Sequence, residues 1–394
     1  MRTLIKNAKL VMPERIIVNG GILVEDGVIQ DVFEEDLVNQ TTEDDVIDAK
    51  GNYAAPGFID VHTHGADGAD FMDGSIDAVL TVCREHLRHG TTSLLPTTLT
   101  CEPEELLLNL GYITEAAKVE GELPEIVGIH LEGPYFSPEQ SGAQDPKYLK
   151  LPDPAEYKQI IERFPLVKMW SIAPELPGAL EMGRWLKKKG VIASIGHSNA
   201  VYDEVVSACE NGYSMATHFY NGMSRLVRKK ALFYLGASES GLLLDELTVT
   251  IISDGIHLPP PLLKLIYKTK GADRICLITD SNRAAGTDAT ESILGSLKNG
   301  RRIEIDSGVA YMPGHEAFGA SISTADLMIR TMYKQVEVPL PDAVKMMSLV
   351  PARALGLDQR KGSLAAGKDA DIVLFDDDIQ ISTVIVKGQI VKEK

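Results

Sequence analysis

The sequence predicts an α/β protein, namely a (β/α)8 TIM-type barrel with a small β-sandwich domain formed by both chain termini. Three observations support this prediction. Strand-like apolar runs alternate with segments of helical periodicity through the middle of the chain, whereas each of the two chain ends shows short runs of β character. We therefore expect a small β domain from residues 1–52 plus 357–394, and a barrel domain over residues 53–356.

The amino-terminal segment, residues 3–50, is predicted to form β hairpins. Asn19–Gly20 and Asp26–Gly27 interrupt its apolar runs, and both dipeptides favour tight turns. At the other end of the chain, runs of β character over 370–375 and 383–386 flank an acidic turn. We expect the two chain ends to pair with each other beside the barrel.

The central segment alternates between strand-like and helical stretches. Its strand-like runs cover residues 57–62, 91–98, 125–132, 167–173, 191–197, 213–218, 247–254 and 274–280. Helical periodicity between them is seen in residues 76–89, 102–118, 153–163, 177–189 and 201–211. After Asp280 the sequence predicts an irregular segment to about residue 320, and then helices near 322–335, 340–348 and 351–356. Eight strands with intervening helices are what a (β/α)8 barrel requires.

Composition and charge exclude several classes of function. The formal net charge of -17 argues against nucleic acid as a partner, because phosphate backbones bind basic surfaces. No segment approaches the ~20 apolar residues of a membrane span, and the start of the chain lacks the apolar stretch of a secretory signal. The scattered cysteines indicate neither a disulfide framework nor a thiolate zinc site. We expect a cytoplasmic protein that does not bind membranes.

Six residues of types that bind metal ions stand at the ends of strand-like runs. His62 and His64 close the first run, and because alternate side chains of a strand point to the same face, both can bind one ion. The other four close separate runs: Glu132, His197, His218 and Asp280. Barrel enzymes keep their active sites at the carboxyl ends of the strands. The order of these residues therefore predicts a metal centre at one rim of the barrel.

The chemistry of these side chains favours Zn²⁺ or Fe²⁺, because imidazole nitrogens and carboxylate oxygens suit both ions and a carboxylate can bridge two of them. The six residues allow one or two divalent ions. One site would use His62, His64 and Asp280 with Glu132, and the other would use Glu132 with His197 and His218. Such a centre lowers the pKa of bound water toward about 7. Asp280 is the expected proton carrier, because a carboxylate beside that water can take a proton and return it to a departing nitrogen.

Two segments of the chain resemble the amidohydrolase superfamily, one over 56–65 (PGFIDVHTHG) and one over 362–371 (GSLAAGKDAD). Within it, the segments HLEGPY over 130–135, THFYNGM over 217–223 and SDGIH over 253–257 resemble N-acetylglucosamine-6-phosphate deacetylases. The resemblance implies a metal-dependent barrel flanked by a β domain, and a homodimer. It also implies hydrolysis of the acetamide of a small amino-sugar phosphate to acetate and a free amine.

The resemblance also assigns roles at the metal centre. In that family the residues matching Glu132, His197 and His218 hold a metal ion, and the residue matching Asp280 is the catalytic acid and base. Many members have lost the second histidine of the first strand. This chain retains His64, which leaves the binuclear arrangement open.

Substrate contacts are implied at the loops around the centre. Residues matching Asn221, Gly222 and His257 touch the sugar or its phosphate in the family. Lys229, with Arg228 beside it, stands where the family has a phosphate-binding arginine, and a lysine holds a phosphate only as a point charge. The alternative for these two residues is a solvated basic loop.

Other polar residues near the predicted centre have alternative roles. Gln144 stands where many members have a histidine that polarises the scissile carbonyl, and its amide can donate a hydrogen bond without carrying charge. Arg283 either binds a substrate anion or pairs with a nearby carboxylate. Asp60 is a candidate to orient a ligand imidazole from behind.

Three histidines are predicted to lie outside the chemistry. His86 and His89 fall on a helix among charged residues, which indicates a solvated face. His130 would point into the barrel one layer below Glu132, where hydrogen-bonded packing is the expected role.

Three hypotheses of function remain from the sequence. The first is hydrolysis of an N-acetylhexosamine 6-phosphate, either N-acetyl-D-glucosamine 6-phosphate or N-acetylgalactosamine 6-phosphate. The second is another amidohydrolase reaction on a small amide. Cyclic amidases of the superfamily bridge their metals with a modified lysine that ends strand four, and this chain has no lysine there, in Ser171–Glu175. The third is a non-catalytic scaffold, against which the retention of all six ligand candidates argues.

Overall fold

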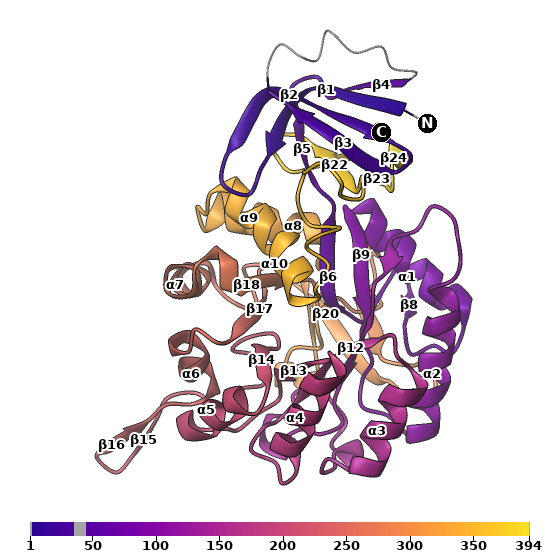
Figure 1. The fold of residues 1–394 in the computed structure, drawn as a ribbon. Coiled ribbons are helices and arrows are strands. Elements are labelled where there is room, and N and C mark those ends of the chain that lie inside the picture. Colours follow the sequence, from indigo (N-terminus) through magenta and orange to yellow (C-terminus); the bar gives the residue numbers. More distant parts are fainter. Residues whose placement is uncertain (1, 35–44, 394) are drawn as a thin grey trace.

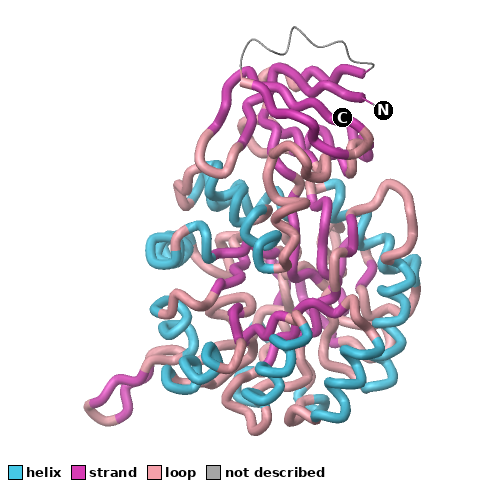
Figure 2. The backbone as a smooth tube through the Cα atoms, in the orientation of Figure 1, coloured by secondary structure: helices cyan, strands magenta, loops and turns pink. Residues whose placement is uncertain are grey.

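The computed structural model describes residues 2–34 and 45–393, so part of the predicted hairpin region, residues 35–44, lies outside the described residues. The chain is an α/β structure, which confirms the predicted class. Strands from both chain ends form one end of the molecule, and the rest consists of central strands surrounded by helices (Figures 1 and 2).

The centre of the larger part consists of parallel strands in two hydrogen-bonded sets, β10-β9-β6 and β11-β12-β13-β14-β17-β18. A parallel bridge between Thr97 and His130 joins the two sets, and the Asp280 N–H donates to the His62 carbonyl at 2.9 Å. The last strand therefore lies beside the first. The bounds are β6 (Phe58–Thr63), β9 (Thr91–Pro96), β10 (Glu125–Ile126), β11 (Ile129–Glu132), β12 (Val167–Ile172), β13 (Ile192–Ile195), β14 (Tyr213–Ala216), β17 (Thr248–Ile252) and β18 (Ile275–Ile278). Each predicted run coincides with one of these strands to within a few residues, except that 125–132 contains two.

Helices follow most of these strands, close to the predicted positions except for α6 and α7, which lie outside the predicted ranges. They are α1 (Ile76–Arg88), α2 (Pro103–Ala116), α3 (Pro154–Arg163), α4 (Ala179–Lys189), α5 (Tyr202–Glu210), α6 (Ala237–Leu243), α7 (Pro260–Lys270), α8 (Ala325–Arg330), α9 (Leu340–Met346) and α10 (Leu349–Ala354). Local sequence explains several of the starts. The Asp153 carboxylate accepts from the Ala155 N–H, with Pro154 in the first turn, so α3 begins there. No helix among the described residues is long and apolar enough to cross a membrane.

The segment after Asp280 corrects one prediction. Residues up to 320 were expected to be irregular, but they contain an antiparallel sheet of β19 (Glu291–Leu294), β20 (Arg301–Asp306) and β21 (Val309–Tyr311). Ser307 and Gly308 both have positive φ, 51° and 83°, as a tight two-residue hairpin turn requires. Leu294, Ile303, Ala310 and Met312 form a small core of their own beneath it. The charged residues on the exposed side of β20 conceal its β character in the sequence.

Both chain ends contribute to one eight-stranded sheet, in the order β24-β23-β22-β5-β1-β2-β3, with β4 beside β1. Its strands are β1 (Arg2–Val11), β2 (Ile16–Glu25), β3 (Val28–Phe33), β4 (Asp45–Asp48), β5 (Tyr53–Pro56), β22 (Ile372–Phe375), β23 (Ile381–Val386) and β24 (Gln389–Glu393). A separate apolar cluster fills this part of the molecule, with Ile5 and Ile22 from one end of the chain and Ile372 and Ile385 from the other. The two ends pair as expected.

Asn19–Gly20 is not a turn, although Asp26–Gly27 is. Asn19 lies inside β2 with φ of 57°, where the register between β1 and β2 shifts. Asn7 in β1 has φ of 54° at the neighbouring shift. Asparagine tolerates the left-handed conformation that a β-bulge needs, so the same residue type that favours a turn here bends a continuous strand.

Candidate metal centre

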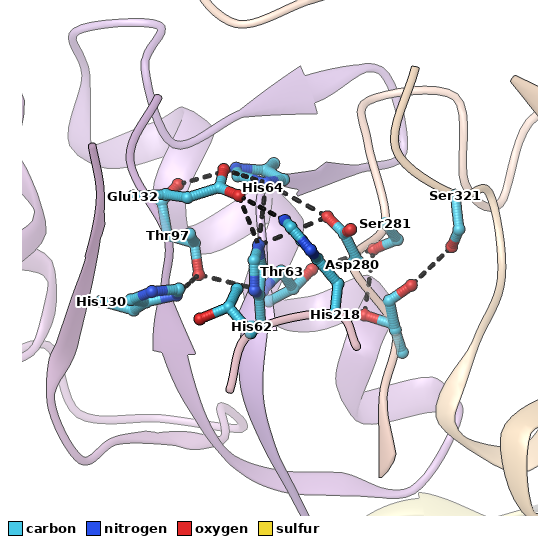
Figure 3. Close-up of polar contacts among 12 residues, drawn as sticks. His62, Thr63, His64, Thr97, His130, Glu132, His218, Asp280, Ser281 and Ser321 are labelled. Atoms are coloured by element: carbon cyan, nitrogen blue, oxygen red, sulfur yellow. Dashed lines mark hydrogen bonds and ion pairs between the residues drawn. The ribbon is translucent and has the colours of Figure 1, made fainter. Parts of the chain in front are cut away.

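The six predicted ligands converge at one rim, at the carboxyl ends of five parallel strands. Figure 3 shows His62, His64, Glu132, His218 and Asp280 of this group. His62 lies in β6 and His64 directly follows it, while Glu132 is the last residue of β11. The other three lie two residues beyond the strands that carry them: His197 after β13, His218 after β14 and Asp280 after β18. All six are buried, so their side chains face a shared interior space.

One group of potential ligand atoms is centred on the first strand. The Nε2 atoms of His62 and His64 are 3.1 Å apart. Oδ1 of Asp280 lies 3.4 Å from Nε2 of His62 and 3.2 Å from that of His64. Oε2 of Glu132 lies 3.4 Å from Nε2 of His64. These atoms provide two nitrogens and two carboxylates around one point.

A second group shares Glu132 with the first. Oε1 of Glu132 lies 3.1 Å from Nε2 of His197 and 2.9 Å from Nε2 of His218. The two imidazole Nε2 atoms are 3.2 Å apart. Because the two oxygens of Glu132 face different groups, its carboxylate lies between two candidate ion positions.

The hydrogen bonds at Nδ1 of the histidine rings show whether Nε2 of each ring is free to bind a cation. Nδ1 of His64 faces the Thr97 carbonyl at 3.2 Å, Nδ1 of His197 faces the Gln140 carbonyl at 2.8 Å, and Nδ1 of His218 faces the Asn221 carbonyl at 3.1 Å. A carbonyl only accepts, so Nδ1 of each ring carries the proton and Nε2 presents a lone pair inward. Lone pairs so close together repel one another unless a positive charge lies between them. The donor set therefore fits a metal ion.

Three of the six ligand candidates have a backbone conformation that is unfavourable for residues other than glycine. The φ angles of His197, His218 and Asp280 are 48°, 29° and 46°. Such conformations cost on the order of 1 kcal/mol or more each and persist only where the surroundings fix them. Here the backbone turns sharply after each strand, which aims the next side chain back over the strand end.

Burial and charge shift the pKa values within the centre. Burial lowers the pKa of His62 well below its ordinary value. When Nε2 of His197 or His218 carries a proton instead of facing a cation, burial of Glu132 is outweighed by the hydrogen bonds from these rings, which hold the pKa of the carboxyl well below its usual range. Burial opposes charge on His64, but hydrogen bonds from a protonated Nε2 to Asp280 and Glu132 raise its pKa well above the ordinary value. The two carboxylates thus favour a positive charge at this place.

Asp60 lies beneath the centre, but its contacts differ from the prediction. Its carboxylate accepts from the backbone N–H of His62 at 3.2 Å and from the Thr279 hydroxyl at 2.6 Å. It does not contact a ligand imidazole. Burial raises the pKa of Asp60 to about 7. Asp60 therefore fastens β6 to the end of β18 instead of orienting a ring.

A cavity of about 290 Å³ opens onto the ligand cluster. Four of the predicted substrate-binding residues line it: Gln144, Asn221, Gly222 and His257. Nδ2 of Asn221 and Nε2 of His257 are buried and have no hydrogen-bond partner among the described residues. Nδ1 of His257 contacts Asp254 at 2.6 Å, which fixes the ring. Two polar atoms are therefore held at the cavity without a partner, as a ligand site requires.

Gln144 contacts a metal-ligand candidate directly. Its amide Nε2 donates to Oε2 of Glu132 at 2.7 Å, and its Oε1 accepts from the Thr100 hydroxyl at 2.9 Å. The sequence prediction gave Gln144 a role toward the substrate. The structure shows a contact of Gln144 with Glu132, the carboxylate shared by the two groups of ligand atoms.

Arg228 and Lys229 lie away from this cavity. They are exposed in β15 (Val227–Lys229), which forms a hairpin with β16 (Leu232–Tyr234) that extends from the body of the molecule (Figures 1 and 2). The basic residue that does line the cavity is Arg225, which the sequence prediction missed. It is the first arginine of the same loop, and only the position of the hairpin shows which one turns inward.

Arg283 is a structural residue and is not available to a substrate anion. Its guanidinium donates to both oxygens of Asp73, at 2.8 and 2.7 Å. The remaining N–H groups donate to the carbonyls of Gly68, Ile293 and Gly295. Of the two alternatives given by the sequence, the carboxylate pair is the one found.

The three histidines that were predicted to lie outside the chemistry are His86, His89 and His130. The prediction for His130 agrees with the structure, and the prediction for His86 does not. His130 is buried, and its Nε2 lies 2.7 Å from the Ser171 hydroxyl, which agrees with hydrogen-bonded packing. His86 was expected on a solvated face, yet it is only 1% exposed. His89 is partly exposed and contacts Asp326. Arg84 and Arg88, which surround His86 in the sequence, gave a misleading signal.

Comparison with known proteins agrees with this geometry. The Amidohydrolase family model matches residues 53–391. The chain is 33% identical to N-acetylglucosamine-6-phosphate deacetylase of Haemophilus influenzae, with 87% of each chain covered. It is 31% identical to N-acetylgalactosamine-6-phosphate deacetylase of Escherichia coli O157:H7, with 93% of each covered.

A solved structure shows the same similarity in three dimensions. The crystal structure of N-acetylglucosamine-6-phosphate deacetylase from Pasteurella multocida superposes with a TM-score of 0.91 at 27% identity, over 99% of both chains. The strand-end ligands, the matched family model and these relatives lead to the same assignment. The chain belongs to the amidohydrolase family, and within it the chain is similar to the N-acetylglucosamine-6-phosphate deacetylases.

Proposed function

We propose that this protein is a metal-dependent deacetylase that hydrolyses the acetamide of an N-acetylhexosamine 6-phosphate, with N-acetyl-D-glucosamine 6-phosphate as the first candidate. The observation that carries the proposal is the convergence of His62, His64, Glu132, His197, His218 and Asp280 at the mouth of one cavity. Relatives named for this activity share about a third of their residues with the chain over most of its length.

One or two divalent ions, Zn²⁺ or Fe²⁺, would be the cofactor. His62, His64 and Asp280 would hold one ion, His197 and His218 would hold the other, and Glu132 would serve both. When bound, such ions polarise a carbonyl group and make a coordinated water more acidic. Inward Nε2 lone pairs and a carboxylate with one oxygen toward each group support the two-ion arrangement.

Asp280 is the proposed acid and base. Its Oδ1 borders the space between the histidine rings, 3.2 Å from Nε2 of His64. Its carboxylate takes a proton from the water that attacks the acetamide carbon, and then delivers that proton to the nitrogen as the carbon–nitrogen bond breaks. The products are acetate and the amino-sugar phosphate.

The sugar phosphate would occupy the cavity beside the centre. Asn221, Gly222 and His257 are proposed to contact the sugar, because they line the cavity and because Nδ2 of Asn221 and Nε2 of His257 have no hydrogen-bond partner in the described part of the chain. Arg225 lines the cavity, and its positive charge suits a phosphate at the rim. Gln144 would direct one amide hydrogen toward Glu132 and the other toward the acetamide.

A homodimer is proposed on the basis of the exposed β15–β16 hairpin. Leu232 and Phe233 at this hairpin are 64% and 67% exposed, which is unusual for large apolar residues. A second copy would cover them. Arg228 and Lys229, which do not line this chain's own cavity, would reach a substrate phosphate only in the cavity of the partner protomer.

For the architecture, we propose a closed (β/α)8 barrel within residues 53–356 and a small β-sandwich domain from residues 1–52 plus 357–394, which β5 (Tyr53–Pro56) joins because it pairs with β1 and β22. The hydrogen bond from Asp280 to the His62 carbonyl, between the last and first strands, supports closure. The separate apolar cluster of the terminal strands supports a second domain. We also propose a cytoplasmic location, since the substrate class belongs to intracellular metabolism, with neither nucleic acid nor membrane as a partner.

The second candidate substrate is N-acetylgalactosamine 6-phosphate, because a relative named for that activity is as similar to the chain as several named for the glucosamine compound. A cyclic amidase is less well supported, because β12 ends without a lysine near the centre. A scaffold role is less well supported because the ligand set is intact.

Acetate release from four compounds tests the proposal: N-acetylglucosamine and N-acetylgalactosamine, each with and without the 6-phosphate, using metal-replete protein. We expect release from at least one phosphorylated compound, with much slower release from both unphosphorylated sugars. Release from none of the four would contradict the substrate assignment. Equal rates with and without the phosphate would contradict the role of Arg225.

A further inference from the structure

Behind the metal-ligand candidates lies a polar cluster that the chemistry described above does not use. It consists of His86 on α1, Thr63 at the end of β6, and Ser281 just after Asp280. The Thr63 hydroxyl lies 2.8 Å from Nε2 of His86 and 2.9 Å from the Ser281 hydroxyl. All three side chains are at most 1% exposed. Figure 3 shows Ser281 beside Asp280, with Thr63 close to both His62 and Asp280.

The donors and acceptors in this cluster can be assigned by starting from the Gly65 carbonyl, which can only accept. The Ser281 hydroxyl donates to the Gly65 carbonyl at 2.9 Å, because a carbonyl only accepts. Ser281 can then accept the Thr63 hydroxyl hydrogen, and Thr63 in turn accepts from the Nε2–H of His86. This order leaves Nδ1 of His86 without a hydrogen, in agreement with its lack of a partner among the described residues. The opposite tautomer would bury an unpaired N–H, which costs more free energy.

The cluster joins the first and last strands at the level of the ligands. Thr63 stands between His62 and His64, and the N–H groups of His64 and Gly65 both donate to the Ser281 carbonyl at 2.9 Å. Asp280, the residue before Ser281, has φ of 46°, so its conformation depends on such neighbours. His86 on α1 is thus connected, through the hydroxyls of Thr63 and Ser281, to the backbone segment that orients the Asp280 carboxylate.

We propose that His86 is a positioning residue for Asp280, acting through Thr63 and Ser281. This inference rests on the proposed function, since it concerns the residue that moves the proton. His86 touches neither the cavity nor a ligand candidate, so it would set the place of the carboxylate relative to His62 and His64. Burial, which lowers the pKa of His86 to about 4, keeps its ring neutral, and the hydrogen bond to Thr63 selects the Nε2–H tautomer.

The test compares His86→Met with His86→Gln. Methionine fills the space but has no N–H, whereas the glutamine amide can donate to Thr63 in place of Nε2. We expect His86→Met to lower kcat about 10- to 100-fold with KM within about twofold, and His86→Gln to recover most of the loss. His89→Gln is the matched control on the same helix. We expect it to lower Tm without lowering kcat, because His89 does not contact the cluster.

Two further measurements separate positioning from stability and from the proposed function. The absorption bands of the Co²⁺-substituted protein report the coordination at the centre without any substrate. They should shift in His86→Met and return in His86→Gln. Ser281→Ala combined with His86→Met should lower kcat no further than the larger single loss. Wild-type kcat in His86→Met with an unshifted spectrum, or equal losses in both His86 variants, would overturn the inference. Absence of acetate release by the wild-type protein would overturn the proposed function alone, because the spectral comparison still holds.

Discussion

Gln144 donates a hydrogen bond to Oε2 of Glu132 at 2.7 Å, and the other end of its amide is fixed, because Oε1 accepts from both the N–H and the hydroxyl of Thr100. Gln144→Leu removes the donor that orients the carboxylate between the two candidate ions. We expect kcat/KM for acetate release to fall about 10- to 100-fold, with a lower metal content after dialysis.

A control distinguishes this role from a contact with the substrate alone. Thr100→Val removes the hydroxyl that donates to Oε1 of Gln144 but keeps the backbone N–H that also donates to it, so a smaller loss is expected. If Gln144 contacted only the substrate, its replacement would raise KM and leave metal content unchanged. That result would contradict the assignment.

Asp280→Asn should remove the proton carrier while keeping the shape of the residue. We expect kcat to fall by about 10²–10⁴-fold, the usual contribution of general acid–base catalysis. Substrate binding, measured at equilibrium by calorimetry, should change little, since the cavity residues Asn221 and His257 remain in place. A variant with near-normal kcat would remove Asp280 from the mechanism.

The ion pairs of His89 with Asp326 and Glu85 are expected to stabilise the fold in a pH-dependent way. Burial opposes its charge, but hydrogen bonds to Asp326 and Glu85 outweigh burial and raise its pKa to about 9, above the ordinary 6.5. Because the folded pKa is the higher one, the contribution is fully present below pH 6.5 and is lost as the pH rises through 9. We expect His89→Gln to cost on the order of 1–2 kcal/mol at pH 6, after allowance for partial exposure, and little at pH 10. Thermal unfolding of both proteins at the two pH values measures this. An equal Tm difference at both would contradict the charged pair.

The exposed hairpin predicts that the dimer is sensitive to a single apolar residue. Phe233→Ser should shift the protein toward the monomer in sedimentation velocity, because Phe233 is 67% exposed in one chain and would be covered by the partner. Leu151→Ser, at another exposed leucine that is 54% exposed, is the control and should leave the assembly unchanged. A monomeric wild-type protein, or a dimeric Phe233 variant, would contradict the proposed interface.

Much of the fold could be predicted because several of its central strands are largely apolar. Runs such as Ile275–Ile278 are buried on both faces, as parallel strands are, and they contrast sharply with the helices between them. β20 was missed because Arg301–Asp306 is mostly charged and only partly buried, so its alternation is weak. The bulge at Asn19 was misread because the left-handed conformation that it supplies serves turns and bulges alike.

The ligand cluster was predictable for a related reason. A residue that ends a buried strand has a position fixed by the sheet, so His62, Glu132 and Asp280 could be placed from order alone. Loops give no such reference: Arg225 lines the cavity, whereas the predicted Arg228 and Lys229 lie on the exposed hairpin. His86 was mispredicted for another reason. A helix residue with charged neighbours in the sequence can still face the core, where His86 forms a hydrogen bond with the buried Thr63 hydroxyl.

The central claim is that these converging side chains hold a metal ion that the reaction needs. The most direct measurement is acetate release from N-acetylglucosamine 6-phosphate by chelator-stripped protein, as Zn²⁺ or Fe²⁺ is added back stepwise, beside Glu132→Gln treated in the same way. We predict no release from the stripped protein, recovery that saturates at one or two equivalents, and little recovery in Glu132→Gln. Full release by the stripped protein would contradict the claim.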